Sequence, residues 1–131
     1  MQFKVVSILL VAILASSSLA AVQDKDGLSE EFSKCIERAA GVDPAMHDCI
    51  SVETKRQDQR LNEVYRKLLA KLDLSRKKQL MEAQRLWLRF TAANCSFYLD
   101  PKGGTAARLS ASECPMLAKA RRATELELFL E

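Results

Sequence analysis

The chain has 131 residues, four cysteines, one histidine and a formal net charge of +3. Acidic and basic residues are interspersed along it, which is typical of solvated helix faces and unlike the concentrated basic patch of a nucleic-acid-binding protein. This length is enough for one domain with a modest hydrophobic core.

The N-terminus has the pattern of a secretory signal peptide. Lys4 supplies a positive start, residues 5–15 form an apolar stretch, and small residues precede Ala21. The apolar stretch is shorter than the ~20 residues that cross a bilayer. No cysteine follows the expected cleavage point, so we expect no lipid or membrane anchor. We therefore predict a cleaved signal at 1–20 and one mature domain at 21–131, periplasmic or secreted, with a net charge of +2 once Lys4 is lost.

All four cysteines lie in the predicted mature part, at Cys35, Cys49, Cys95 and Cys114. An even count in a short exported chain implies two disulfides. We favour Cys35–Cys49 with Cys95–Cys114, which closes two short loops, each worth roughly 3 kcal/mol. Cys49–Cys95 with Cys35–Cys114 stays open as the alternative. No spacing matches the C-x₂₋₄-C of zinc sites, so we expect no metal and no cofactor.

Helical periodicity dominates the mature chain, and no segment reads as a strand. Ser29 is the expected N-cap of a short helix that ends at Gly41, and a second helix is predicted from about Pro44 to Leu72. In the polar middle of the second helix, Glu53 and Gln57 continue the apolar stripe. They must therefore meet polar partners or face a groove.

A third helix is predicted to begin near Ser75, its N-cap, and to end before Asp100. Its expected inward face comprises Leu80, Gln84, Trp87, Leu88, Thr91, Cys95 and Tyr98. We expect residues 96–112 to form the long loop of the domain. The last helix should begin near Ser112, with Pro115 in its first turn. These elements predict an all-α fold, a small disulfide-stapled bundle of about four helices, two of them long and antiparallel.

Two sets of residues are candidates for binding. The first is a polar cluster at the core-facing phase of the two long helices, formed by Asp58, Asn62, Tyr65, Gln84 and Trp87. It is interpreted either as a buried hydrogen-bond network that fixes helix register, which we favour, or as a ligand groove floored by Trp87. The second is the predicted loop, in which a disulfide would tie both ends of a protrusion carrying Lys102, Gly103, Gly104, Thr105 and Arg108. That restraint lowers the ordering cost of binding.

Catalysis is not indicated. His47 is the lone histidine and is interpreted as a surface or packing residue. With every cysteine paired, no thiolate nucleophile is expected. The chain also lacks the nucleophile-elbow, phosphate-loop and dinucleotide-binding motifs. We therefore predict a binding protein and not an enzyme.

The order of several motifs resembles the LprI-type lysozyme inhibitor domain. They are Met46-x-x-Cys49, Glu53, Asp58, Leu61-Asn62-x-x-Tyr65 and Leu68, then Ala83-Gln84-x-x-Trp87, Cys95, Gly103-Gly104, Cys114, Arg122 and Leu126. The resemblance covers roughly residues 35–130. It departs from the family pattern at Thr91 and Ala92, where the family usually places an Arg-Asp pair; a neighbour such as Arg89 would have to replace it.

The resemblance implies an all-helical, exported bacterial protein that inhibits lysozyme or a related cell-wall hydrolase. In this hypothesis the Gly-Gly loop occupies the sugar-binding cleft of the enzyme, with Lys102 or Arg108 facing its catalytic carboxylates. Two alternatives stay open. One is an envelope accessory or small-molecule-binding protein that uses the polar cluster, and the other is an immunity partner of a secreted toxin.

Overall fold

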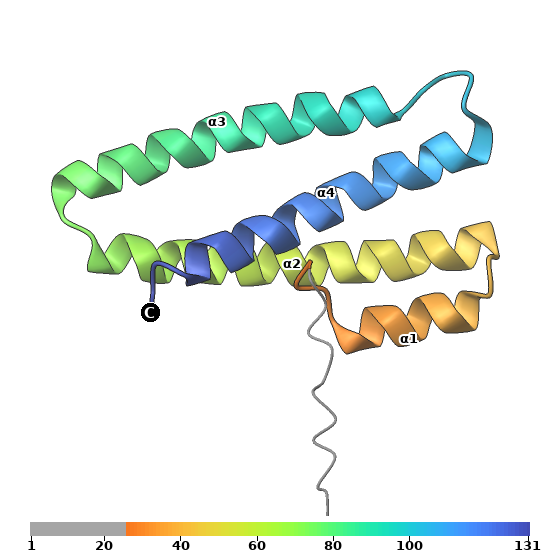
Figure 1. Ribbon diagram of the computed structural model, residues 1–131, viewed down its shortest axis with the longest axis horizontal. Coiled ribbons are helices and arrows are strands. Elements are labelled where there is room, and N and C mark those ends of the chain that lie inside the picture. The colour runs from red at the N-terminus through yellow and green to blue at the C-terminus, as the bar shows by residue number, and fades with distance from the viewer. Residues whose placement is uncertain (1–25) are drawn as a thin grey trace, which may run out of the picture.

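The computed structural model describes residues 26–131, which form four helices in an all-α arrangement (Figure 1). The predicted signal peptide at 1–20 lies outside the described residues. Within residues 26–131, no helix is both long enough and apolar enough to span a bilayer.

The first two helices form an antiparallel hairpin. Helix α1 spans Glu30–Ala39, and Ser29 caps it as predicted, its hydroxyl accepting from the Phe32 N–H at 3.1 Å. The chain then turns through Ala40 and Gly41, both at positive φ. Helix α2 spans Asp43–Lys71 with a proline in its first turn, close to the predicted bounds.

The third helix, α3, spans Leu74–Tyr98. Asp73 is its N-cap in place of the expected Ser75, because the Asp73 carboxylate accepts from the backbone N–H of Arg76 at 2.9 Å. None of its residues is buried. Leu88 and Tyr98, both predicted to point inward, are 55% and 48% exposed, so that part of the expected inward face is wrong.

The last helix, α4, spans Gly104–Glu127, so its predicted start near Ser112 is wrong. The Gly-Gly step confines the turn to Leu99–Gly103, and the alanine- and arginine-containing segment that follows has sufficient helix propensity to continue the helix. Pro115 therefore lies inside α4 and not in its first turn. Pro115 cannot donate to the carbonyl one turn earlier, yet the helix continues past it.

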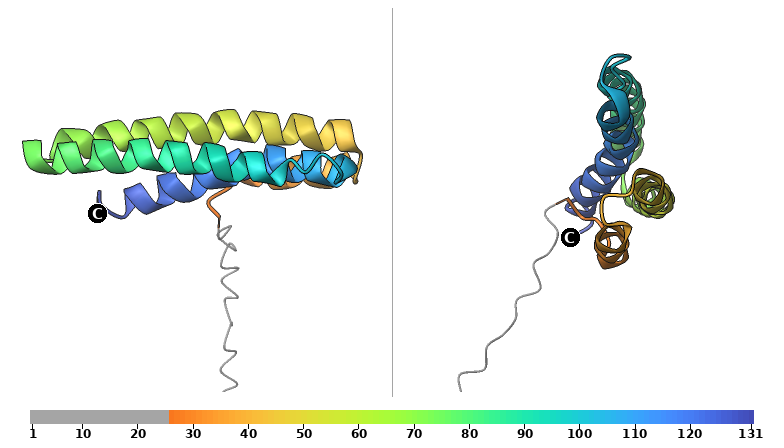
Figure 2. Two further views of the ribbon diagram at one scale, coloured as in Figure 1. Left: turned by 90° about the horizontal axis from the view of Figure 1, so that it is seen from above. Right: turned by 90° about the vertical axis from the view of Figure 1, so that its right-hand side faces the viewer.

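Helix α4 lies between α2 and α3 and packs on both, while α1 packs on α2 (Figure 1). Seen end-on, the three long helices form a bent layer with α4 at the bend (Figure 2). The core joins α2 to α4 through Leu61, Val64, Leu68, Ala123 and Leu126. Tyr65, Leu72, Leu80, Trp87 and Leu130 pack around it.

The favoured disulfide pairing is confirmed. Cys35–Cys49 joins α1 to α2, and Cys95–Cys114 joins α3 to α4. Each bond therefore closes one helical hairpin, and neither crosses from one hairpin to the other.

Candidate binding surfaces

The polar middle of α2 meets partners, as the sequence required. Glu53 is 1% exposed, and its carboxylate accepts from the Ser29 N–H at 2.9 Å and from the Ser29 hydroxyl at 2.6 Å. It also accepts from Gln57 Nε2 at 2.7 Å and from Arg56 Nη1 at 2.6 Å. Burial alone raises the pKa of Glu53, but the hydrogen bonds from Ser29, Gln57 and Arg56 outweigh it and leave the pKa below its ordinary value.

A second network begins one turn further along α2. The Arg60 guanidinium pairs with the carboxylate of Glu127 at 2.5 Å and donates to the Thr124 hydroxyl at 2.9 Å, both on α4. It also donates to the carbonyl of Gly27 at 3.2 Å. Arg60 thus ties the segment before α1, the middle of α2 and the end of α4 together. The two networks together give structural roles to Glu53, Arg56, Gln57 and Arg60 in the middle of α2.

The predicted polar cluster assembles around one open groove between α2 and α3. Asp58, Asn62 and Tyr65 line it from α2, and Gln84 and Trp87 line it from α3. Lys119 of α4 also lines it, and the groove has a volume of about 530 Å³. We call it the α2–α3 groove.

The contacts inside the α2–α3 groove decide between the two interpretations of the cluster. Asn62 is exposed and donates to Asp58 at 3.1 Å, while Asp58 also pairs with Lys119 at 2.8 Å. On the other wall, Arg122 Nε donates to Gln84 Oε1 at 3.1 Å. Because Asn62 is exposed and the Asp58 side chain is 48% exposed, the favoured interpretation of a fully buried network is wrong. A ligand role for the groove remains a prediction.

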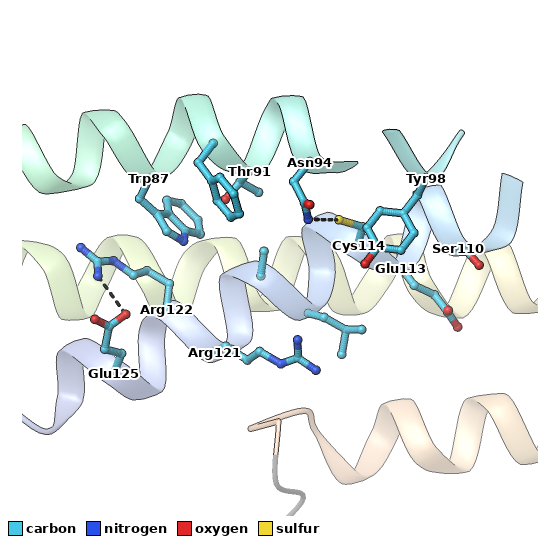
Figure 3. A pocket seen from close by; sticks show the side chains of 13 residues that line it. Trp87, Thr91, Asn94, Tyr98, Ser110, Glu113, Cys114, Arg121, Arg122 and Glu125 are labelled. Carbon is cyan, nitrogen blue, oxygen red and sulfur yellow. Dashed lines mark hydrogen bonds and ion pairs between the residues drawn. The ribbon is translucent and has the colours of Figure 1, made fainter. Parts of the chain in front are cut away.

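Trp87 also lines a second groove, of about 380 Å³, between α3 and α4 (Figure 3). Figure 3 shows Thr91, Asn94 and Tyr98 along its upper wall, with Arg121 and Arg122 projecting from α4. We call it the α3–α4 groove. The Arg122 guanidinium lies 6.0 Å from the centre of the Trp87 ring, within cation–π range. Arg89, the neighbour considered in place of the family's Arg-Asp pair, is exposed.

The predicted loop is shorter than expected, which changes the second candidate site. Lys102 and Gly103 lie in the turn, whereas Gly104, Thr105 and Arg108 belong to the first turns of α4. All five are exposed. Cys95–Cys114 braces this end of the α3–α4 hairpin, and Phe97, 86% exposed, adds an apolar side chain near the end of α3. We call residues 97–108 the hairpin end; sequence reasoning missed the exposed aromatic there.

His47 contacts α4: its Nδ1 lies 3.2 Å from the Ser112 hydroxyl. This contact links the first turns of α2 to α4 and agrees with a packing role. In the portion of the chain from residue 26 onward, no group of three or more histidine, cysteine or acidic residues gathers at a distance that would hold a metal.

Comparison with known protein families assigns this domain to one of them. The model of the lysozyme inhibitor LprI family matches residues 35–126, which span both disulfides and both grooves. The chain belongs to the LprI lysozyme inhibitor family. No curated protein and no solved structure matches it. The LprI match begins at the first cysteine, within α1, and ends at Leu126, a core residue near the end of α4.

Proposed function

We propose that this LprI-family protein is exported, remains unanchored, and binds lysozyme or a related cell-wall hydrolase as an inhibitor without catalytic activity of its own. Family membership supports the inhibitor role. Two disulfides at bonding distance and the secretory pattern of the first 20 residues support export to the periplasm or beyond it.

The hairpin end is the surface best suited to enter an enzyme cleft. It lies at one end of the molecule, the end that also holds the α1–α2 turn (Figure 1). Cys95–Cys114 joins its two helices about one turn before the end of α3 and nearly three turns after the start of α4. A connection braced in this way loses little conformational entropy on binding. Lys102 and Arg108 supply positive charge for catalytic carboxylates, and Phe97 supplies an apolar contact of the kind that anchors interfaces.

Charge distribution indicates which surface meets the enzyme. Helix α3 carries five cations against one acid, a net +4, and the cations are Arg76, Lys77, Lys78, Arg85 and Arg89. A cationic lysozyme is repelled by that surface and gains no long-range steering from a mature net charge of +2. Attraction must therefore be local, between the tip cations and the acidic cleft.

The test is lysis of a cell-wall suspension by lysozyme with the purified mature protein added. We expect slower lysis, and we expect Lys102→Ala with Arg108→Ala to weaken inhibition at least about tenfold, equivalent to ~1.4 kcal/mol. The matched control, Arg66→Ala with Lys67→Ala, removes the same two residue types from exposed positions far along α2. Undiminished lysis at a large molar excess of the protein refutes the proposal.

The alternative role, an envelope protein that binds a small molecule, rests on one observation. The residues of the predicted polar cluster line an open groove and not a sealed core.

A further inference from the structure

The α2–α3 groove exists because of the position of α4. Since α4 lies between α2 and α3 and packs on both, it holds the two walls of the groove apart, and an open groove remains between them. The volume of about 530 Å³ lies within the usual range for small-molecule sites, about 300–1,000 Å³.

The charges that line the α2–α3 groove are largely neutralised within it. Asp58 pairs with Lys119, and Glu82 pairs with Arg85. Lys78 is the further cation of its lining. A strongly anionic or cationic ligand would have to break these pairs. A paired ammonium or carboxylate nevertheless keeps free N–H groups or lone pairs, so the groove offers donors and acceptors at fixed positions.

The same groove has an aromatic and apolar component. Trp87 and Tyr65 line it together with Met81 and Leu88, which are 56% and 55% exposed. Arg122 lines the α3–α4 groove and not this one, so its guanidinium braces the indole from the other side. The aromatic wall is therefore held in place before any ligand arrives, which lowers the ordering cost of binding.

These two components together select a ligand class. A lipid chain is disfavoured, because Asp58, Asn62 and Lys119 would lose their solvent without gaining partners. A sugar ring has hydroxyls at its edge, which both donate and accept, and an apolar face of C–H groups that packs on aromatic rings. Its lack of charge suits a groove whose own charges are already paired.

We propose that the α2–α3 groove binds an uncharged oligosaccharide. Trp87 and Tyr65 contact the ring faces, and Asp58, Asn62 and Gln84 hydrogen-bond the hydroxyls. This site lies on the helix walls and is separate from the hairpin end, so it goes beyond the proposed inhibitor function and does not depend on it.

Trp87 is the only tryptophan in the chain and therefore reports the site directly. The mature protein is titrated with tri-N-acetylchitotriose, followed by tryptophan fluorescence and by calorimetry. We expect a saturable fluorescence change and a matching heat. Asn62→Ala should weaken binding about tenfold, the loss expected for one good hydrogen bond of ~1.4 kcal/mol.

Asn94→Ala is the matched control, because Asn94 lines the α3–α4 groove and Trp87 borders both grooves. It should leave sugar binding unchanged. Equal urea midpoints for both variants establish that each is folded. No response up to the solubility limit of the sugar overturns the proposal, as does a loss of binding with Asn94→Ala but not with Asn62→Ala. If inorganic phosphate displaces the sugar and changes the tryptophan fluorescence, the groove is an anion site, and the oligosaccharide proposal is overturned.

The two functions are separable by experiment. Asn62→Ala should keep its inhibition of lysozyme, whereas Lys102→Ala with Arg108→Ala should keep its sugar binding. Failure of the lysis assay alone therefore leaves the groove proposal standing, and failure of the sugar titration alone leaves the inhibitor proposal standing.

Discussion

Replacing Glu53 with glutamine perturbs the most buried charged group of the described chain while keeping its shape. The Glu53 carboxylate is 1% exposed and accepts from Ser29, Gln57 and Arg56, at 2.6 to 2.9 Å. In Glu53→Gln, the new amide N–H₂ cannot accept, so it faces the Arg56 guanidinium as one donor against another. Two of the four accepted hydrogen bonds, those to Oε2, are lost or rearranged.

The magnitude follows from what those bonds contribute. A hydrogen bond to a charged group contributes about 1.5–3 kcal/mol, and removing one partner of a buried pair costs about 3–5 kcal/mol. Arg56 is 42% exposed and can regain water, which reduces the loss. We therefore expect Glu53→Gln to lower the free energy of unfolding by about 2–3 kcal/mol.

The assay is urea unfolding of the oxidised protein, monitored by circular dichroism. Glu63→Gln is the matched control: it makes the same chemical change on the same helix, in a pair with Lys67 that is 58% exposed at Glu63. Exposed pairs contribute up to about 1 kcal/mol and often less. If Glu53→Gln costs no more than Glu63→Gln, the argument that the Ser29–Glu53 network holds α1 on α2 is refuted.

Three further predictions concern pH, backbone geometry and the disulfide at the hairpin end. Because the folded pKa of Glu53 lies below its ordinary value of 4.5, its contribution to stability is present above that value and disappears as the pH falls through the lowered folded pKa. Urea titrations from about pH 7 to about pH 3 should therefore show the gap between wild type and Glu53→Gln shrinking, and a constant gap contradicts this. Gly27 and Gly41 both have positive φ, 74° and 79°, but an added Cβ at Gly27 would lie 2.7 Å from the Thr124 hydroxyl whereas at Gly41 it meets nothing within 4 Å. Thermal melts should show Gly41→Ala costing about 1 kcal/mol and Gly27→Ala about 1 kcal/mol more, and equal losses would count against the close packing at Gly27. Replacing Cys95 and Cys114 together with serine should cost about 3 kcal/mol of unfolding free energy and weaken inhibition in the lysis assay; unchanged inhibition would show that the brace is not needed there.

Local signals made much of the fold predictable. The Ser29 cap, the turn at Gly41 and the proline in the first turn of α2 each act within a few residues, so sequence alone locates the ends of the early helices. The predicted start of α4 was about eight residues too late, more than two helical turns, because residues between Gly104 and Ser112 show no clear apolar periodicity. Helix propensity alone continues the helix there, and that signal is weak.

The residues of the α2–α3 groove were predicted from the sequence, but their exposure to solvent was not. Helical phase correctly placed Asp58 and Asn62 on the same side of α2, and Gln84 and Trp87 on the facing side of α3. Whether those sides touch depends on where α4 lies, and no pattern within α2 or α3 carries that information. The same holds for Arg60 and Glu127, whose ion pair joins residues 67 positions apart.

The placement of the two disulfides divides the molecule into two covalently closed halves. One contains α1 and α2, the other contains α3 and α4, and the backbone joins them only at Leu72–Asp73. The main contact between the halves is the apolar seam of α2 on α4. A chain cut at that connection should therefore behave as a split protein, whose two separately oxidised fragments reassociate through the seam. For the same reason, the Leu72–Asp73 connection is the natural place for new termini in a circular permutant.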